Sequence, residues 1–294
     1  MKFKLFIVAI LFVLTGCFAA QTASAFSISL APLARQMEII KQEILALKSL
    51  IENFNSTKEV SAASYVAEDL SSGKILLSKN TEDQHPIASV TKLMTAVVSL
   101  ENIDMDEKIT LTDKMLSPFG ESSCLYAGLK ISAKDLLKAM LVQSSNDAAQ
   151  ALSYFLGNEK FVKKMNKKAK DLDMENTVYY DVHGLSKDNQ STAKDLAKLV
   201  SYINKNYPEI WNNAKNNNFW LADASGQMLK FQNLNNFYYL DDFVGGKTGY
   251  TDQAKETLAS VFEVNGKQVA ITLLYSENRM SDTFNILKQL KKIK

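Results

Sequence analysis

The length and composition of the chain restrict the class of protein it can be. At 294 residues, with 46% apolar residues, it is long enough for one large domain or two small ones with packed cores. Its formal charge of +2 is close to balance, so we expect no nucleic acid partner. Its 2 histidines and 2 cysteines are too few for a histidine-rich metal site or a disulfide framework, and we expect no metal or other cofactor.

The N-terminus has the pattern of an export signal. A positively charged start precedes an unbroken apolar run at residues 5–14, which is too short for an ordinary membrane-spanning helix. A small-residue cleavage site predicts a signal over residues 1–25, whereas a lipoprotein-like box predicts a signal over residues 1–16 and a lipid on Cys17. With either site the chain works outside the cytoplasmic membrane, secreted or membrane-associated. Cys124 then has no intramolecular disulfide partner, and we expect it to be a small buried thiol.

Residues 26–62 are expected to form an amphipathic helix and a linker before the main domain. Their apolar residues recur at alternating steps of four and three: Leu33, Met37, Ile40, Ile44, Leu47, Ile51 and Phe54. This spacing is typical of the a/d seam of a heptad pattern. Residues 33–54 are therefore interpreted either as a short coiled coil, which forms a weak homo-oligomer or a stalk, or as a helix packed on the domain that follows.

Residues 63–294 are expected to fold as one domain. Strands are predicted at residues 64–68, 75–78, 219–223, 227–231, 258–264 and 268–275, with a turn at residues 71–73 and a hairpin turn at Asn265-Gly266. Helices are predicted at residues 89–100, 132–156, 159–172, 191–203 and 281–294, with capping boxes at Ser132 and Thr192. Because the strands lie at both ends and most helices lie between them, the pattern predicts a sheet built from both ends of the domain, with a helical subdomain packed on it.

The tetrad S-x-x-K occurs three times, and context separates the copies. Those at residues 71–74 and 191–194 fall in a turn and at the start of a helix with a polar face. Ser89 instead leads into a helix that is apolar nearly all round and should be buried. Burial of an uncompensated lysine at position 92 would cost free energy, so its presence there points to a function. A spacing of three places Ser89 and Lys92 on one helix face. Burial lowers the pKa of a lysine, so its neutral amine can take the proton of a serine nucleophile.

Two further motifs follow along the chain. Residues 144–146, Ser-Ser-Asn, come after an apolar stretch, but S-x-N also occurs elsewhere and is a weak signal by itself. Residues 246–249, Gly-Lys-Thr-Gly, occur once, before the C-terminal strands. Their glycines allow a substrate to approach the backbone closely. Their lysine and hydroxyl groups suit the binding of a carboxylate.

Together and in this order, the three motifs resemble the signature of penicillin-binding proteins and serine β-lactamases. The stretches at residues 87–96, 144–149, 183–185, 191–193 and 246–251 resemble the low-molecular-weight D-alanyl-D-alanine carboxypeptidases. The resemblance implies an α/β fold of the β-lactamase/DD-peptidase kind, with an antiparallel sheet and a central helical subdomain, for residues 63–294. It also implies a serine-type carboxypeptidase that trims peptidoglycan stem peptides ending in D-Ala-D-Ala and is inhibited by β-lactam antibiotics.

The resemblance also assigns the residues that carry out the reaction. Ser89 is expected to attack the carbonyl between the two D-alanines, with Lys92 as its base. Ser144 is expected to pass a proton to the leaving D-alanine. The backbone N–H groups of Ser89 and Tyr250 are expected to form an oxyanion hole.

Substrate binding falls to a second group of residues under the same resemblance. Asn146 is expected to hydrogen-bond the substrate backbone. Lys247 and Thr248 are expected to hold the terminal carboxylate, with Gly249 in the same strand segment, and Lys247 also helps to keep Lys92 neutral.

Departures from the family pattern leave alternatives open. Ser145 stands where glycine is frequent, Lys255 follows Ala254 where glycine is usual, and we expect no C-terminal β-domain or anchoring helix. An endopeptidase that cuts D-Ala cross-links would use the same site. A serine β-lactamase is disfavoured because Glu175 lacks the context of a deacylating glutamate, and an inactive wall-binding protein is disfavoured by the intact motifs.

Overall fold

The structure is a computed structural model that describes residues 37, 41, 59–116 and 124–293. The chain divides into two compact units, Met1–Glu52 and Asn53–Lys294. The predicted export signal, the candidate lipidation site Cys17 and, apart from Met37 and Lys41, the heptad segment at residues 33–54 lie outside the described residues. Within the described part of the chain, no helix is both long and apolar enough to cross a bilayer.

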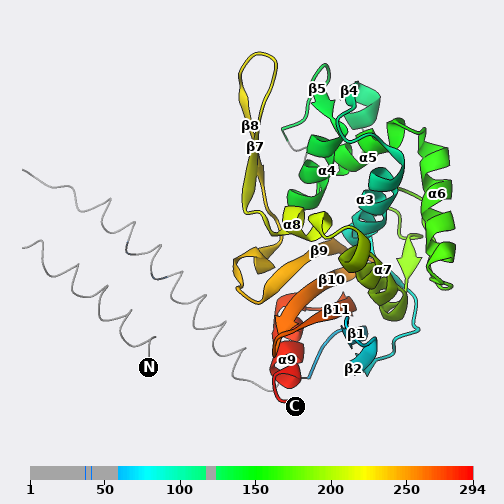
Figure 1. Ribbon diagram of the computed structural model, residues 1–294, viewed down its shortest axis with the longest axis vertical. Helices are drawn as coiled ribbons and strands as arrows, with labels where there is room; N and C mark the ends of the chain where they lie inside the picture. The colour runs from blue at the N-terminus through cyan, green and yellow to red at the C-terminus, as the bar shows by residue number, and fades with distance from the viewer. Residues whose placement is uncertain (1–36, 38–40, 42–58, 117–123, 294) are drawn as a thin grey trace, which may run out of the picture. The chain divides into compact units, whose positions relative to one another are not determined.

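A five-stranded antiparallel sheet forms the base of the second unit, with strand order β2-β1-β11-β10-β9 (Figure 1). Its strands are β1 (Ser64–Asp69), β2 (Lys74–Lys79), β9 (Phe243–Thr251), β10 (Lys255–Val264) and β11 (Lys267–Ser276). Ser64 of β1 pairs with Leu274 of β11, so strands from the two ends of the domain lie side by side. The predicted fold class is confirmed.

Local sequence signals set the turns of this sheet. Asn265 and Gly266 join β10 to β11 with φ angles of 53° and 75°, the left-handed backbone that a two-residue Asn-Gly hairpin turn requires. Gly73, with a φ of 69°, lies in the turn between β1 and β2. Both turns are where the sequence predicted them.

Helices and short strands fill the chain between β2 and β9. The helices of the described residues are η1 (Ala88–Val90), α3 (Thr91–Asn102), η2 (Asp113–Leu116), α4 (Ala133–Val142), α5 (Asn146–Tyr154), α6 (Asn158–Asp171), α7 (Ala193–Asn206), α8 (Glu209–Lys215), η3 (Asn236–Tyr239) and the C-terminal α9 (Arg279–Leu290). The short strands are β3 (His85–Pro86), β4 (Lys108–Thr110), β5 (Lys130–Ser132), β6 (Gln190–Ser191), β7 (Asn218–Ala222) and β8 (Met228–Gln232). The predicted caps are present, since the side chains of Ser132 and Thr192 accept from the N–H groups of Asp135 and Asp195.

Two predicted helices differ from the structure. The single helix predicted at residues 132–156 is divided into α4 and α5 by a turn, in which Ser144 has a φ of 58°. A non-glycine residue in this left-handed region ends the α-helical path. The last helix ends at Leu290 rather than continuing to the end of the chain.

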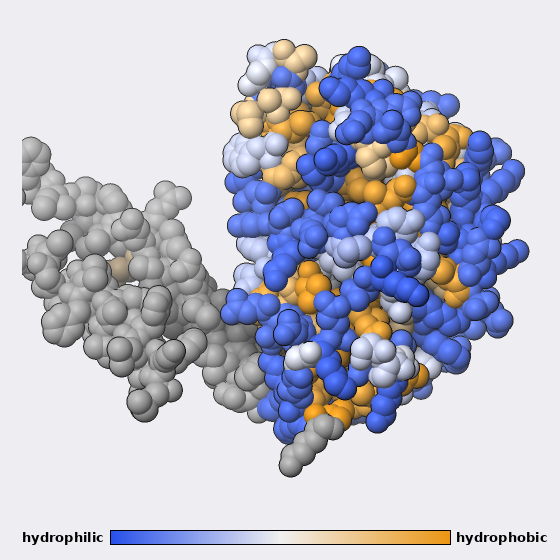
Figure 2. Space-filling model, in the orientation of Figure 1, coloured by the Kyte–Doolittle hydropathy of each residue, from blue (hydrophilic) through white to orange (hydrophobic). Residues whose placement is uncertain are grey.

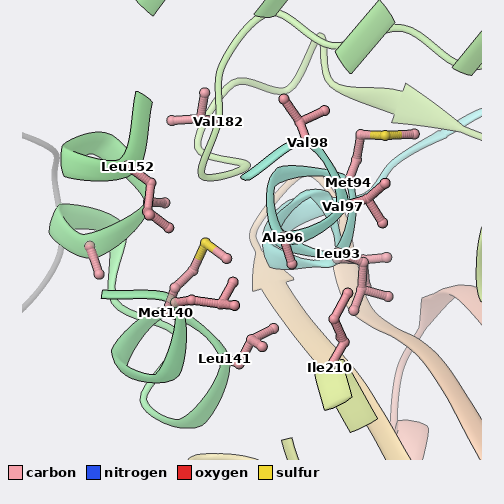
Figure 3. Packing of buried hydrophobic residues seen from close by; sticks show 14 of the residues in the cluster. Leu93, Met94, Ala96, Val97, Val98, Met140, Leu141, Leu152, Val182 and Ile210 are labelled. Atoms are coloured by element: carbon pink, nitrogen blue, oxygen red, sulfur yellow. The ribbon is translucent and has the colours of Figure 1, made fainter. Parts of the chain in front are cut away.

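Two hydrophobic clusters hold the elements together. The larger one gathers α3, α4, α5 and the loop before β6; Figure 3 shows side chains such as Leu93 and Val97 of α3 and Leu141 of α4 packed in it. Every residue of α3 from Thr91 to Ser99 is buried, as its apolar sequence predicted. The smaller cluster lies between the sheet and α9, with α7 contacting β1 and β11 of the sheet.

A two-stranded hairpin of β7 and β8 projects beside the helices (Figure 1). Cys124 lies next to it and is exposed, so the predicted burial of this thiol is wrong; its Sγ donates to the carbonyl of Lys230 at 3.2 Å. Hydrophilic residues dominate the face of the second unit shown in Figure 2, and hydrophobic residues occur there in small groups.

Candidate active site

The nucleophile candidate stands at the start of a buried helix. Ser89 belongs to the turn η1, directly before α3, and Lys92 lies in the first turn of α3 with its side chain fully buried. The Nζ of Lys92 is 2.9 Å from the Oγ of Ser89. The one-turn spacing therefore brings the two groups into hydrogen-bond contact, as predicted.

The lysines of the other two S-x-x-K tetrads lie at the surface, and these tetrads make other contacts. Ser71 donates from its Oγ to Asp69 at 2.6 Å in the β1–β2 turn, and Lys74 is exposed. Lys194 forms an ion pair with Glu82 on the surface. The turn predicted at Ser71 and the surface position of Lys194 are therefore observed, whereas the choice of Ser89 as the nucleophile remains a prediction.

Lys92 has three oxygen neighbours, and their chemistry fixes the direction of its lone pair. Nζ donates to Asn146 Oδ1 at 2.7 Å and to the carbonyl oxygen of His183 at 2.6 Å. Both of these oxygens can only accept. A neutral amine has two N–H groups, which these acceptors take, so its lone pair is left for the third neighbour, the hydroxyl of Ser89. Burial lowers the pKa of Lys92 to about 7, against the charge of Asp181, which raises it.

The Ser-Ser-Asn motif forms the turn between α4 and α5. Ser145 is the N-cap of α5, and its side chain accepts from the N–H of Ala148 at 3.1 Å. Serine is a favourable N-cap residue, so this bond stabilises the start of α5. Asn146, the first residue of α5, contacts Lys92, and Ser144 lies two residues before it. Support of Lys92 by Asn146 was not predicted; its binding of substrate remains a prediction, as does the role of Ser144.

The Gly-Lys-Thr-Gly motif lies inside β9 at the edge of the sheet, not before the strands. Lys247 and Thr248 are buried, with 2% and 8% of their surfaces exposed, and Lys247 Nζ donates to the carbonyl of Thr248 at 2.8 Å. Burial lowers the pKa of Lys247 well below its usual value, and the charges of Lys92 and Arg279 lower it further. Burial and these neighbouring charges therefore both disfavour a positive charge on Lys247.

Gly249 brings this strand against the nucleophile. A Cβ added at Gly249 would lie 2.8 Å from the backbone nitrogen of Ser89 and 2.5 Å from Thr257 Oγ1. A side chain has no room there, so glycine permits the contact between β9 and η1. Tyr250, the next residue, is 60% exposed. Its position beside Gly249 is compatible with the predicted oxyanion hole.

Two contributors to the site were missed by sequence reasoning. Arg279 opens α9; its guanidinium donates to the carbonyl of Gly249 at 3.0 Å, and its backbone N–H donates to Glu256. The carbonyl of His183 accepts from Lys92 Nζ, a contact that the sequence did not predict. Neither contribution could be recognised in the sequence. Arg279 reaches β9 through tertiary packing, and every residue has a backbone carbonyl, so the residue type does not show which carbonyl is used. Among the described residues, no cluster of three or more His, Cys, Asp or Glu side chains suits a metal ion.

Comparison with known proteins agrees with this geometry. The sequence profile of the D-alanyl-D-alanine carboxypeptidase family, peptidase S11, matches residues 51–277. This chain belongs to that family. The family predicted from the sequence motifs is thereby confirmed.

Relatives carry two functional names. A D-alanyl-D-alanine endopeptidase of Escherichia coli is 32% identical over 85% of this chain and 82% of its own length. The D-alanyl-D-alanine carboxypeptidase DacF of Bacillus subtilis is 32% identical over 71% of this chain and 56% of its own length. Among solved structures, penicillin-binding protein D2 of Listeria monocytogenes in its cefotaxime-bound form is 29% identical, covers 80% of this chain and 98% of its own, and gives a TM-score of 0.69.

Proposed function

We propose that this family member is a serine-type D-Ala-D-Ala carboxypeptidase that trims peptidoglycan stem peptides through an acyl-enzyme on Ser89. The observation that carries the proposal is the contact between Ser89 and the buried Lys92, whose other two neighbours accept hydrogen bonds only. A lysine with a pKa of about 7 is neutral in a large fraction of molecules near neutral pH, as a base for a serine must be.

The first step transfers an acyl group to the enzyme. Ser89 Oγ attacks the carbonyl carbon between the two D-alanines as its proton passes to Lys92 Nζ. The carbonyl oxygen takes the displaced electron pair, and the N–H groups of Ser89 and Tyr250 stabilise its negative charge. The C–N bond then breaks, and the leaving nitrogen receives a proton through Ser144. Water later hydrolyses the ester and restores the hydroxyl of Ser89.

Recognition of the chain end falls to the strand β9. The terminal carboxylate of the substrate binds beside Lys247 and Thr248, where its negative charge favours the protonated form of Lys247 that burial and the neighbouring charges disfavour. Asn146 binds the substrate backbone next to the reacting bond. A substrate whose terminus is an amide lacks this charge and should react more slowly.

The second candidate activity is endopeptidase cleavage of D-Ala cross-links, which is favoured by the name and the high mutual coverage of the E. coli relative. Two peptides distinguish the activities. A linear peptide ending in D-Ala-D-Ala should release one alanine, and its amide should react poorly. Equal rates on acid and amide, together with cleavage of a cross-linked dimer, would favour the endopeptidase. A β-lactamase is less well supported, since Glu175 is exposed on the surface.

The decisive experiment is labelling with a fluorescent penicillin followed by mass spectrometry of the tagged peptide. We expect the tag on the peptide that contains Ser89, and none in Ser89→Ala. A tag on Ser71 or Ser191, or no tag on the wild-type protein, would contradict the assignment. A tag that persists for many minutes would also argue against a β-lactamase, which releases its acyl group rapidly.

The proposed substrate places the enzyme outside the cytoplasmic membrane. We propose export by the N-terminal signal, with a lipid on Cys17 or cleavage after residue 25, and a heptad segment at residues 33–54 that forms a weak homo-oligomer or packs on the domain. Incorporation of labelled palmitate that is lost in Cys17→Ser would support the lipid.

Replacing Ile40, Ile44 and Leu47 with serine should either lower the molecular mass in solution, if the heptad segment forms an oligomer, or lower the melting temperature, if it packs on the domain. No change in either quantity would contradict the heptad interpretation.

A further inference from the structure

The loop before β6 is folded around one carboxylate. Asp181 Oδ1 accepts hydrogen bonds from the N–H groups of His183 at 3.0 Å and Gly184 at 2.6 Å, and its Oδ2 accepts from the N–H of Ser186 at 2.6 Å. The buried Asn189 closes the loop by donating from Nδ2 to Asp181 Oδ1 at 2.9 Å. A carboxylate is a stronger acceptor for such donors than a neutral side chain, so the path of the loop depends on Asp181.

This loop is attached by its backbone to the helix that carries the base. The carbonyl of Val182 accepts from Thr95 Oγ1 at 2.6 Å, and the carbonyl of His183 accepts from Lys92 Nζ at 2.6 Å. Gly184 packs so closely on the residue before Ser89 that an added Cβ would lie 1.9 Å from the carbonyl oxygen of that residue. A displacement of the loop would therefore move both the base and the backbone beside the nucleophile.

We propose that Asp181 is a positioning residue for acylation. Its carboxylate folds the loop so that the His183 carbonyl holds the amine of Lys92 against Ser89, and its negative charge favours the protonated amine that forms as Ser89 attacks. The inference rests on the proposed function, because it assumes that Lys92 accepts the proton of Ser89.

The charges around Lys92 support this role. Lys247 faces it from β9, and His183 and Asp181 face it from the loop. Of these groups, Asp181 is the one that carries a negative charge, and it raises the pKa of Lys92 against the effect of burial. Because Lys92 gains a proton in the transition state, a negative charge held nearby stabilises that state more than the ground state with a neutral amine.

The test is the pH dependence of penicillin acylation in Asp181→Asn. Without the charge, the pKa of Lys92 falls, so its neutral form persists to lower pH. The acidic limb of the acylation rate should move to lower pH by about one unit. The plateau rate should fall by about tenfold, because the weaker base and the lost charge both raise the barrier. A purely structural loop residue would lower the rate without moving the limb.

A matched control lies in the same loop. Asp188 is exposed and is not among the charged groups that shift the pKa of Lys92. Asp188→Asn removes a charge of the same sign from the loop, so it should leave both the acidic limb and the plateau rate unchanged. A limb that stays in place in Asp181→Asn, or that moves equally in Asp188→Asn, would overturn the inference while the wild-type label on Ser89 still supports the proposed function. Failure of the wild-type protein to label would instead overturn the proposed function.

A second variant serves if Asp181→Asn does not fold. Asp181→Glu keeps the charge but moves the carboxylate by one methylene, so we expect a lower plateau with the limb near its wild-type pH. Wild-type acylation rates at every pH in Asp181→Glu would show that the position of the carboxylate does not matter, and would overturn the inference.

Discussion

Two buried lysines meet at the site, one on the helical side and one on the sheet, and their surroundings are opposite. Lys92 on α3 has oxygen atoms on three sides and the charge of Asp181 nearby. Lys247 on β9 donates to the carbonyl of its own neighbour, and its pKa is lowered by burial and by the positive charges of Lys92, when Lys92 is protonated, and of Arg279.

This difference separates two chemical tasks. On the helical side, the neighbouring oxygen atoms can form hydrogen bonds with Lys92 in both its neutral and its protonated form. This suits a base that gains and loses a proton in each cycle. On the strand side, Arg279 pairs with Glu256 at 3.7 Å, whereas Lys247 donates to a neutral carbonyl, which suits a site that an anion completes when it arrives with the substrate. The helical side of the site therefore suits proton transfer, and the strand side suits recognition of a carboxylate.

The largest effect should come from removing the base. Lys92→Arg keeps the positive charge, but a guanidinium stays protonated at neutral pH and cannot accept the proton of Ser89. We expect the rate constant for penicillin acylation to fall by about a hundredfold or more. Lys74→Arg, the same change in the exposed tetrad of the β1–β2 turn, should have no effect. Retained acylation in Lys92→Arg would remove the distinction between the two lysines.

The complementary change on the strand is Lys247→Gln. It removes the cation that the substrate carboxylate should bind, and we expect kcat/KM for a D-Ala-D-Ala peptide acid to fall by about ten- to a hundredfold. The peptide amide, which has no such charge, should lose much less. Equal losses on acid and amide would show that Lys247 does not recognise the terminal carboxylate.

A smaller effect should follow from adding charge on the helical side. Asn146→Asp places a carboxylate in contact with Lys92 Nζ, which raises the pKa of the lysine. Because the neutral amine then forms only at higher pH, the acidic limb of acylation should move to higher pH by about one unit. Asn158→Asp, at the exposed first position of α6, is the matched control and should not move the limb. An unmoved limb in both variants would argue against Lys92 as the titrating base.

The smallest effect concerns the turn that follows the strand. Lys255 has a φ of 53°, in the left-handed region that favours glycine. Lys255→Gly should relieve this strain and raise the free energy of unfolding by about 0.5–1 kcal/mol, measured by urea denaturation. Lys74→Gly, at the start of β2, should instead destabilise the protein. Loss of stability in Lys255→Gly would show that the side chain of Lys255 contributes more than the strain costs.

Features encoded locally were predictable from the sequence, and features created by tertiary contact were not. The Asn265-Gly266 turn and the caps at Ser132 and Thr192 depend on neighbouring residues, so their positions were predicted correctly. The pairing of Ser89 with Lys92 followed from helix geometry.

The missed features arise between distant segments. The break at Ser144 requires a backbone conformation that serine rarely adopts, and it is held in place by packing around α4 and α5. The exposure of Cys124 depends on where the β7–β8 hairpin lies, and its residue type favours burial. The contact of Arg279 with Gly249 joins residues that are 30 positions apart, and no motif marks it.

The pairing of β1 with β11 has a consequence for how the chain folds. Ser64 is opposite Leu274, so the middle of the sheet joins residues 210 positions apart (274 − 64). Contacts of such long range form late and slowly, because the loop between them must be ordered first. During synthesis, β1 has no partner on this side until β11 has emerged, and its exposed edge is open to incorrect pairing. A chain of this topology benefits from being kept unfolded until its C-terminal strands are available.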